Sequence, residues 1–300
     1  EDEKMAEDKK KLSDTLAWKQ PNIADAAPEQ IEKAQEFCEG YKEFLNHGKT
    51  ERECVKTAVE MLKKAGYQEF EIGKTYSAGD KIYQVNRNKA LVAATIGQKP
   101  MDEGVRLNAA HIDSPRLDLK PNPLYESGEL SLLKTHYYGG IRKYQWAAIP
   151  LSMHGVVVKK GGETVEIHIG DEPGDPVFCV TDLLPHLGAE QSQRKLGEGI
   201  KGEELNVVIG SLPYADKEEE NRLKLQALYL LHEKYGMTER DFQRAEIEIV
   251  PAYPAVDVGL DRSMVGAYGQ DDRVCAYTAL AAELECQNPV YTSICVLTDK

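Results

Sequence analysis

Residues 105–115 have the sequence VRLNAAHIDSP, and this segment decides the fold that we expect. It is rich in β-forming residues, and side chains two positions apart in a strand share one face. His111 therefore lies on the same face as the apolar positions 105, 107 and 109, and Asp113 follows two residues later. Because open α/β sheets bind ligands at the carboxyl ends of their strands, this polar pair favours an α/β fold with a site at that edge.

Two helices and two more strands are expected before this segment. Apolar residues recur at helical spacing over residues 28–47. Thr50 and Glu53 have the spacing of a capping box, in which each side chain bonds the other residue's backbone N–H, and this predicts a second helix. Residues 81–85 and 90–96 are rich in β-forming residues and predict strands.

The chain changes character after residue 116, with short apolar runs separated by turn residues. Residues 159–162, KKGG, predict a hairpin turn, and residues 218–236 predict a helix. Ile247 and Ile249 alternate with glutamates, as in a half-buried strand. We interpret this region as a β-rich insert in a core domain, which predicts three parts: residues 1–116, residues 117–250 (the insert) and residues 251–300.

The core domain is expected to resume with a helix at residues 272–285 and a strand at residues 291–297. This strand is nearly all apolar, as is typical of a strand buried on both faces of a parallel sheet. The predicted fold class is therefore α/β, a mixed sheet flanked by helices and interrupted by a β-rich domain.

Composition and charge argue against several classes of protein. The net charge of the 300 residues is −13, with no dense Lys/Arg cluster, which argues against a nucleic-acid partner. The longest apolar runs are far shorter than the roughly 20 residues of a membrane-spanning helix. Residues 1–11 alternate in charge and lack the apolar region of a secretory signal. The six cysteines lack Cys-x-x-Cys spacing, so we expect reduced, buried thiols in a cytoplasmic protein without membrane partners.

His111 and Asp113 have the residue types and the spacing of a metal site. Imidazole is a common zinc ligand, and a carboxylate on the other ring nitrogen fixes the tautomer that binds the metal. The alternative is a strand-end histidine with local hydrogen bonds, followed by a turn that begins at Asp113. His-x-Asp is a short pattern with many accidental matches, so the spacing alone favours the alternative.

Asp271 is the second candidate, in the sequence GQDDR at residues 269–273 before a predicted helix. An aspartate at a helix start is ordinarily a cap. A carboxylate can also bridge two cations, which makes Asp271 a candidate ligand if a second metal motif is present. Local bonding or solvation is expected instead for four histidines elsewhere: His47, His154, His168 and His232. The chain has no Gly-x-Ser-x-Gly, P-loop or Gly-x-Gly-x-x-Gly motif, which argues against serine hydrolases, NTPases and dinucleotide enzymes.

Three segments together closely resemble the aspartyl aminopeptidase family, in particular its bacterial branch. They are AHIDSPRLDLKP at residues 110–121, THYYGGI at 135–141 and YGQDDRV at 268–274. Their order and spacing also match, and the resemblance extends from about residue 28 to residue 300. The twelve-residue block around His111 is far more specific than His-x-Asp, and it favours the metal-site interpretation.

The resemblance implies a cytoplasmic hydrolase that removes single residues from peptides with a free N-terminus, using two divalent metal ions, usually Zn²⁺, with Co²⁺ or Mn²⁺ as alternatives. It implies that His111 binds one metal ion, that Asp113 orients His111 and acts in catalysis, and that Asp271 bridges both ions. The insert corresponds to the family's dimerisation domain. Family members build homo-oligomers in which dimers assemble to a dodecamer, and His186 matches a histidine that reaches the substrate site of a neighbouring subunit.

One departure from the family pattern concerns the last residues. The family places a pair of glutamates, one a general base and one a metal ligand, just after the position of Lys300, so the base is expected beyond this residue. Two alternatives stay open: a non-catalytic assembly subunit with a vestigial metal site, and a related amidohydrolase that deacylates small molecules. A Glu-Glu pair after Lys300 would argue against the first, and a panel of aminoacyl and N-acyl substrates would test the second.

We predict that residues 1–300 alone lack peptidase activity, because His111 and Asp271 supply only two metal ligands and no base. Hydrolysis of aminoacyl chromogenic substrates in the presence of Zn²⁺, Co²⁺ or Mn²⁺ measures this. Robust metal-dependent turnover by these 300 residues would show the prediction to be wrong.

Overall fold

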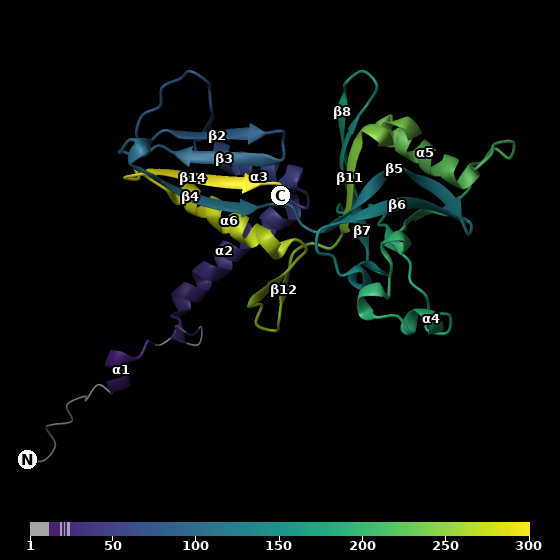
Figure 1. Ribbon diagram of the computed structural model, residues 1–300, viewed down its shortest axis with the longest axis horizontal. Coiled ribbons are helices and arrows are strands. Elements are labelled where there is room, and N and C mark those ends of the chain that lie inside the picture. Colours follow the sequence, from purple (N-terminus) through teal and green to yellow (C-terminus); the bar gives the residue numbers. More distant parts are fainter. Residues whose placement is uncertain (1–11, 19, 21, 23–24) are drawn as a thin grey trace, which may run out of the picture. The chain divides into compact units, whose positions relative to one another are not determined.

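The computed structural model describes residues 12–18, 20, 22 and 25–300 (Figure 1). The chain forms two compact units, Glu1–Gly40 and Tyr41–Lys300. The described part of the first unit contains helix α1 (Leu12–Leu16) and the start of α2 (Pro28–His47), a helix that agrees with the predicted one. The charge pattern of residues 1–11 lies outside the described residues. The elements below belong to the second unit.

A five-stranded mixed sheet contains the segment that decides the fold. Its strands are, in spatial order, β1 (Gln68–Glu69), β2 (Lys81–Asn86), β3 (Ala90–Thr95), β14 (Thr292–Thr298) and β4 (Val105–His111). β14 pairs antiparallel with β3 and parallel with β4. The predicted α/β class is confirmed, and the strand predicted at residues 105–111 is found with the same bounds.

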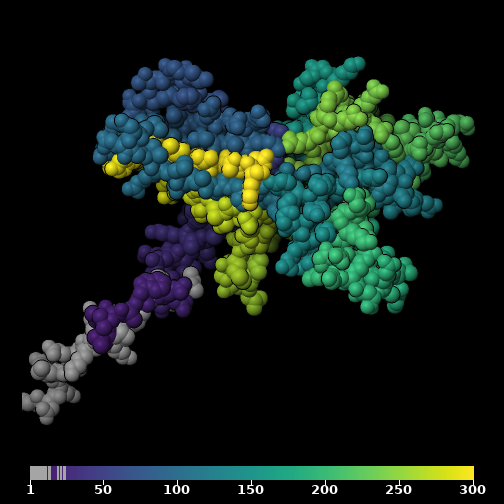
Figure 2. Space-filling view, in the orientation of Figure 1, coloured from purple at the N-terminus to yellow at the C-terminus, as the bar shows by residue number. Residues whose placement is uncertain are grey.

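Helices α3 (Glu51–Lys64) and α6 (Gln270–Glu285) pack against this sheet. Their apolar residues share one core with the buried sheet residues Leu91 and Leu297. The other face of the sheet is more open, since Leu107 is 60% exposed. In Figure 2 the atoms of β14 are visible as a yellow band between blue strands. The prediction that β14 is buried on both faces is wrong, because Ile294 and Val296 on its open face are only half-buried and Thr298 is exposed.

The second unit also contains a seven-stranded antiparallel sheet with its own apolar core. Its strands are, in spatial order, β8 (Thr164–Ile169), β7 (Leu151–Val158), β11 (Ala245–Pro251), β5 (Arg116–Ser127), β6 (Leu130–Tyr138), β10 (Val207–Gly210) and β9 (Cys179–Val180). The predicted hairpin turn joins β7 to β8. This sheet spans the region predicted as the insert, and the boundaries at residues 116 and 250 stay predictions.

Several short elements complete the described chain. They are α4 (Ala189–Ser192), α5 (Arg222–Tyr235), β12 (Val256–Val258), β13 (Met264–Gly266) and the 3₁₀ helices Met101–Glu103, Lys143–Trp146, Leu196–Glu198, Gly202–Glu204 and Glu239–Arg244. Helix α5 begins four residues later than predicted, because Asn221 has left-handed backbone angles and interrupts the helix there. No helix among the described residues combines the length and the apolar character needed to cross a bilayer.

Two details differ from the sequence-based expectations. The six cysteines are free, as predicted, but they are not all buried: Cys275 is exposed, whereas Cys54 and Cys295 are buried. Strand β11 is not half-buried, because Glu248 is only 2% exposed. Glu248 Oε2 lies 3.3 Å from Arg116 Nε, so this buried polar side chain has a partner that the alternation of residues 246–249 does not show.

The start of α3 provides a test of local stability. The predicted capping box is confirmed: the Glu53 N–H donates to the Thr50 hydroxyl at 3.3 Å, and the Thr50 N–H donates to Glu53 Oε2 at 3.0 Å. We predict that Thr50→Ala lowers the free energy of unfolding by about 1 kcal/mol, because the Glu53 N–H loses its partner. Thr50→Ser, which keeps the hydroxyl, is the control. Equal free energies of unfolding of the two variants in urea denaturation would contradict the capping role.

Candidate functional site

His111 is the last residue of β4, at the edge where β4 and β14 both end. Its Nδ1 lies 3.1 Å from the backbone oxygen of Asp113 and 3.2 Å from Asp113 Oδ1. Because two oxygens lie beside Nδ1, that nitrogen carries the ring proton in the neutral imidazole. The lone pair is then on Nε2, which lies 3.5 Å from Asp271 Oδ1.

Asp113 is buried and held from several sides. The backbone N–H of Lys300 donates to Oδ1 at 3.0 Å, and the Tyr138 hydroxyl donates to Oδ2 at 2.8 Å. The Arg116 guanidinium covers the Tyr138 ring at 4.1 Å from its centroid. Burial and the neighbouring Asp113 carboxylate raise the pKa of Tyr138 to about 12, so its hydroxyl stays protonated and remains a donor. Asp113 can therefore orient His111 but has little freedom to move.

Asp271 lies at the start of α6 with an almost fully exposed carboxylate, 96% by side-chain area. The N-cap position belongs to Gly269, and neither Asp271 nor Asp272 has helical backbone angles. Asp271 is thus not the ordinary helix cap that its position in the sequence suggests. Its backbone oxygen accepts a hydrogen bond of 3.1 Å from the Ser114 hydroxyl, which ties this turn to the segment after β4.

Arg273 fixes the same turn from inside the protein. This side chain is only 1% exposed. Its Nε donates to the backbone oxygen of Ile112 at 3.0 Å, and its Nη2 donates to that of Lys49 at 2.8 Å. The start of α6 is therefore joined to the residue between His111 and Asp113. Sequence analysis did not identify Arg273 or Tyr138 as site residues, although both lie inside the segments that carry the family resemblance.

The geometry of His111 and Asp271 fits a shared metal ion. Two ligand atoms at about 2.0–2.2 Å from a tetrahedral zinc ion lie about 3.3–3.5 Å from each other. The distance from His111 Nε2 to Asp271 Oδ1 is 3.5 Å. Among the described residues, two other groups each bring together three side chains that could bind a metal ion. Neither group contains His111 or Asp271. Protein zinc sites have at least three protein ligands, so this pair alone would be an incomplete zinc site.

His186 is exposed in the segment between β9 and α4. The hydrogen bonds and ion pairs around His111, Asp113 and Asp271 in the described chain do not include it. The structure thus brings three of the four predicted site residues together and leaves the fourth apart.

Comparison with known proteins identifies the family of this chain. Residues 44–300 match the family described as Aminopeptidase I zinc metalloprotease (M18). The chain belongs to the M18 family of aminopeptidases, and the family resemblance predicted from the three sequence segments is confirmed.

Individual relatives give the extent of the similarity. A probable M18 family aminopeptidase 1 from Clostridium acetobutylicum is 49% identical over 275 residues, which cover 90% of this chain and 59% of the relative. The crystal structure of an M18 aminopeptidase from Thermotoga maritima has a TM-score of 0.87 and 46% identity, and the match covers 93% of this chain and 61% of that one. The chain therefore spans about six tenths of the length of such relatives.

A more distant solved structure is the mApe1 dodecamer of S. cerevisiae. It is 18% identical, with a TM-score of 0.65, and the match covers 90% of this chain and 60% of that chain. At this identity the likeness shows the shared fold alone.

The contact between Gly269 and Arg273 provides a test of the turn that carries Asp271. A Cβ atom on Gly269 (φ +80°) would lie 2.1 Å from Arg273 Nη1. Gly73 has a similar φ of +85° with nothing within 4 Å of such an atom, so Gly73→Ala is a matched control for the backbone penalty of about 1–2 kcal/mol. We predict that Gly269→Ala lowers the free energy of unfolding, measured in guanidinium, by at least about 1 kcal/mol more than Gly73→Ala does. Equal costs would mean that the Arg273 contact does not constrain the turn.

Proposed function

We propose that this chain provides part of the active site of a metal-dependent aminopeptidase that removes the N-terminal residue of peptides. The observation that carries the proposal is the 3.5 Å approach of His111 Nε2 to Asp271 Oδ1, two side chains 160 positions apart in the sequence. Membership of a zinc metalloprotease family supports the same reaction class.

In this proposal, His111 would bind one of two divalent metal ions, and the Asp271 carboxylate would be a ligand available to both. Asp113 Oδ1 accepts a hydrogen bond from the Nδ1–H group of His111 and so leaves the Nε2 lone pair free to bind a metal ion. Tyr138 holds the Asp113 carboxylate in the orientation that this requires. When bound, a pair of divalent ions lowers the pKa of a water molecule and polarises the peptide carbonyl. Zn²⁺ is the proposed ion, and the imidazole and carboxylate donors also suit Co²⁺ or Mn²⁺.

The proposed substrate is a peptide with a free N-terminus, and the proposed assembly is a homo-oligomer built from dimers. The exposure of His186 supports its role as a residue offered to the site of a neighbouring subunit. The description of the S. cerevisiae mApe1 structure as a dodecamer is consistent with a dodecameric assembly. The dimerisation role of the region around the seven-stranded sheet and the cytoplasmic location stay predictions.

Substitutions in the protein expressed from its complete reading frame test the proposed roles. We expect His111→Ala to remove bound metal and to lower kcat/KM on aminoacyl substrates by at least about 100-fold. Asp113→Asn should lower metal affinity or activity by about 10–100-fold, because it perturbs the orientation of a ligand rather than removing one. Metal analysis and steady-state kinetics measure both effects.

His232→Ala is the control, because His232 is exposed and its Nδ1 lies 3.2 Å from the nearby backbone oxygen of Met237, apart from the residues assigned to the site. Full metal content and activity in His111→Ala would refute the assigned site. Hydrolysis of N-acyl amino acids in place of aminoacyl substrates would instead support the deacylase alternative.

A further inference from the structure

A second group of histidines and carboxylates lies where the β7–β8 hairpin meets the start of α3. His154 in β7 and His168 in β8 are register partners, so their side chains lie on the same face of the hairpin. Their ring centroids are 4.6 Å apart. Glu53, in the first turn of α3, faces the pair from the other element, and Asp171 lies two residues after the end of β8. This cluster shares no residue with the His111 site.

Each ring nitrogen of His154 has a carboxylate beside it. Nδ1 lies 2.7 Å from Glu53 Oε1, and Nε2 lies 3.0 Å from Asp171 Oδ2. Asp171 also lies 3.4 Å from His168 Nε2 and accepts a hydrogen bond of 3.0 Å from the Lys49 ammonium group. His154 is only 1% exposed, whereas the Glu53 side chain is 24% exposed and has room to move from Nδ1 to the wider spacing of two ligands on one ion.

The donor set is one that transition metals prefer. Glu53, His154 and His168 each offer a ligand atom, and the three atoms lie within 4.8 Å of one another. Two imidazoles and one carboxylate are the protein ligands of zinc sites that keep a position open for water. A metal-bound histidine is commonly oriented by a carboxylate at its other ring nitrogen. Asp171 is in this position at Nε2 of His154, as Asp113 is at Nδ1 of His111.

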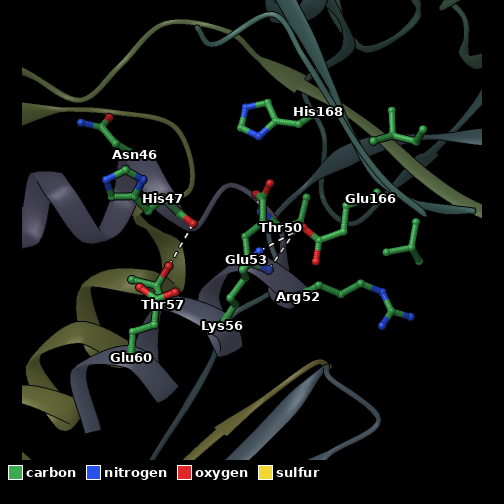
Figure 3. A pocket seen from close by; sticks show the side chains of 13 residues that line it. Asn46, His47, Thr50, Arg52, Glu53, Lys56, Thr57, Glu60, Glu166 and His168 are labelled. Carbon is green, nitrogen blue, oxygen red and sulfur yellow. Dashed lines mark hydrogen bonds and ion pairs between the residues drawn. The ribbon is translucent and has the colours of Figure 1, made fainter. Parts of the chain in front are cut away.

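The cluster opens into a cavity of about 300 Å³. Figure 3 shows this cavity between the start of α3 and the β8 strand, with Glu53 and His168 among the side chains that line it. The His168 side chain is 45% exposed, so solvent and ions can reach the donors from this side.

We propose that Glu53, His154 and His168 bind one divalent transition-metal ion, with Asp171 positioning His154. Bound there, the ion links the first turn of α3 to the β7–β8 hairpin and leaves a coordination position facing the cavity. The site is distinct from the proposed aminopeptidase centre and does not depend on it.

A proton competes with the metal for this cluster. Burial lowers the pKa of His154, but the hydrogen bonds with Asp171 and Glu53 outweigh it and raise the pKa to about 9. In the absence of metal, the cluster is therefore a buried ion-pair network in which the imidazolium lies between two carboxylates. This network is the competing account that the experiment must distinguish from a metal site.

The experiment uses the double variant His111→Ala/Asp271→Asn, so that ions at the other site do not contribute. Equilibrium dialysis against Zn²⁺ alone, followed by elemental analysis, should show one ion per chain. Adding His168→Ala should weaken Zn²⁺ binding by at least about 100-fold, and adding Glu53→Gln by at least about 10-fold. Co²⁺ should give visible absorption bands of a site with nitrogen and oxygen ligands, and these bands should disappear in the His168→Ala background.

His47→Ala is the matched control, because His47 lines the same cavity but is paired with Glu43 at 3.3 Å outside the cluster. It should leave the Zn²⁺ stoichiometry and affinity unchanged. Circular dichroism confirms that each variant is folded, which is expected for His168→Ala because that side chain is partly exposed. Absence of stoichiometric Zn²⁺ in the double variant, or binding that survives both His168→Ala and Glu53→Gln, would overturn the proposal and leave the ion-pair network.

Discussion

The buried guanidinium of Arg273 is the constraint on which the candidate site depends. Burying a charged group costs free energy unless it has hydrogen-bond partners, and Arg273 donates through Nε and Nη2 to two backbone oxygens from different parts of the chain. Those oxygens belong to Lys49, just before α3, and to Ile112, between His111 and Asp113. A single side chain thereby fixes the start of α6 against the end of β4, and this places Asp271 opposite His111.

A second set of buried ionisable side chains lies between α3 and the seven-stranded sheet. Arg116, at the start of β5, lies 3.5 Å from Glu51 in α3 and 3.3 Å from Glu248 in β11. Burial and the nearby Glu51 carboxylate raise the pKa of Glu248 well above its usual value, so Glu248 binds a proton more readily than an exposed glutamate does. Because removing one partner from such a group leaves an uncompensated charge, these residues are more constrained than their polar character suggests.

Local patterns in the sequence were enough to predict much of the fold. The strand at residues 105–111, the capping box at Thr50 and the hairpin turn before β8 depend on neighbours in the chain, and they are found where predicted. The features that were missed depend on partners far away in the sequence. Glu248 is buried beside Arg116, which lies more than 130 positions earlier in the sequence. Asp271 is held in its exposed position because Arg273 is anchored to the backbone of Ile112. Periodicity and capping rules describe neighbouring residues and cannot show either contact. The approach of His111 to Asp271 was predicted from family resemblance, since spacing alone favoured a local role for both.

The parallel pairing of β14 with β4 has a consequence for how the site and the core are linked. Thr298 is the register partner of His111, and Lys300 bonds Asp113 just beyond it. A slip of β14 by one residue would turn Cys295 and Leu297 out of the helix-covered core and would also withdraw the Lys300 amide from Asp113. The packing of Cys295 and Leu297 in the core therefore fixes the register that aligns the Lys300 amide with Asp113. A shift of this register at the edge of the sheet would also disrupt the packing in the core.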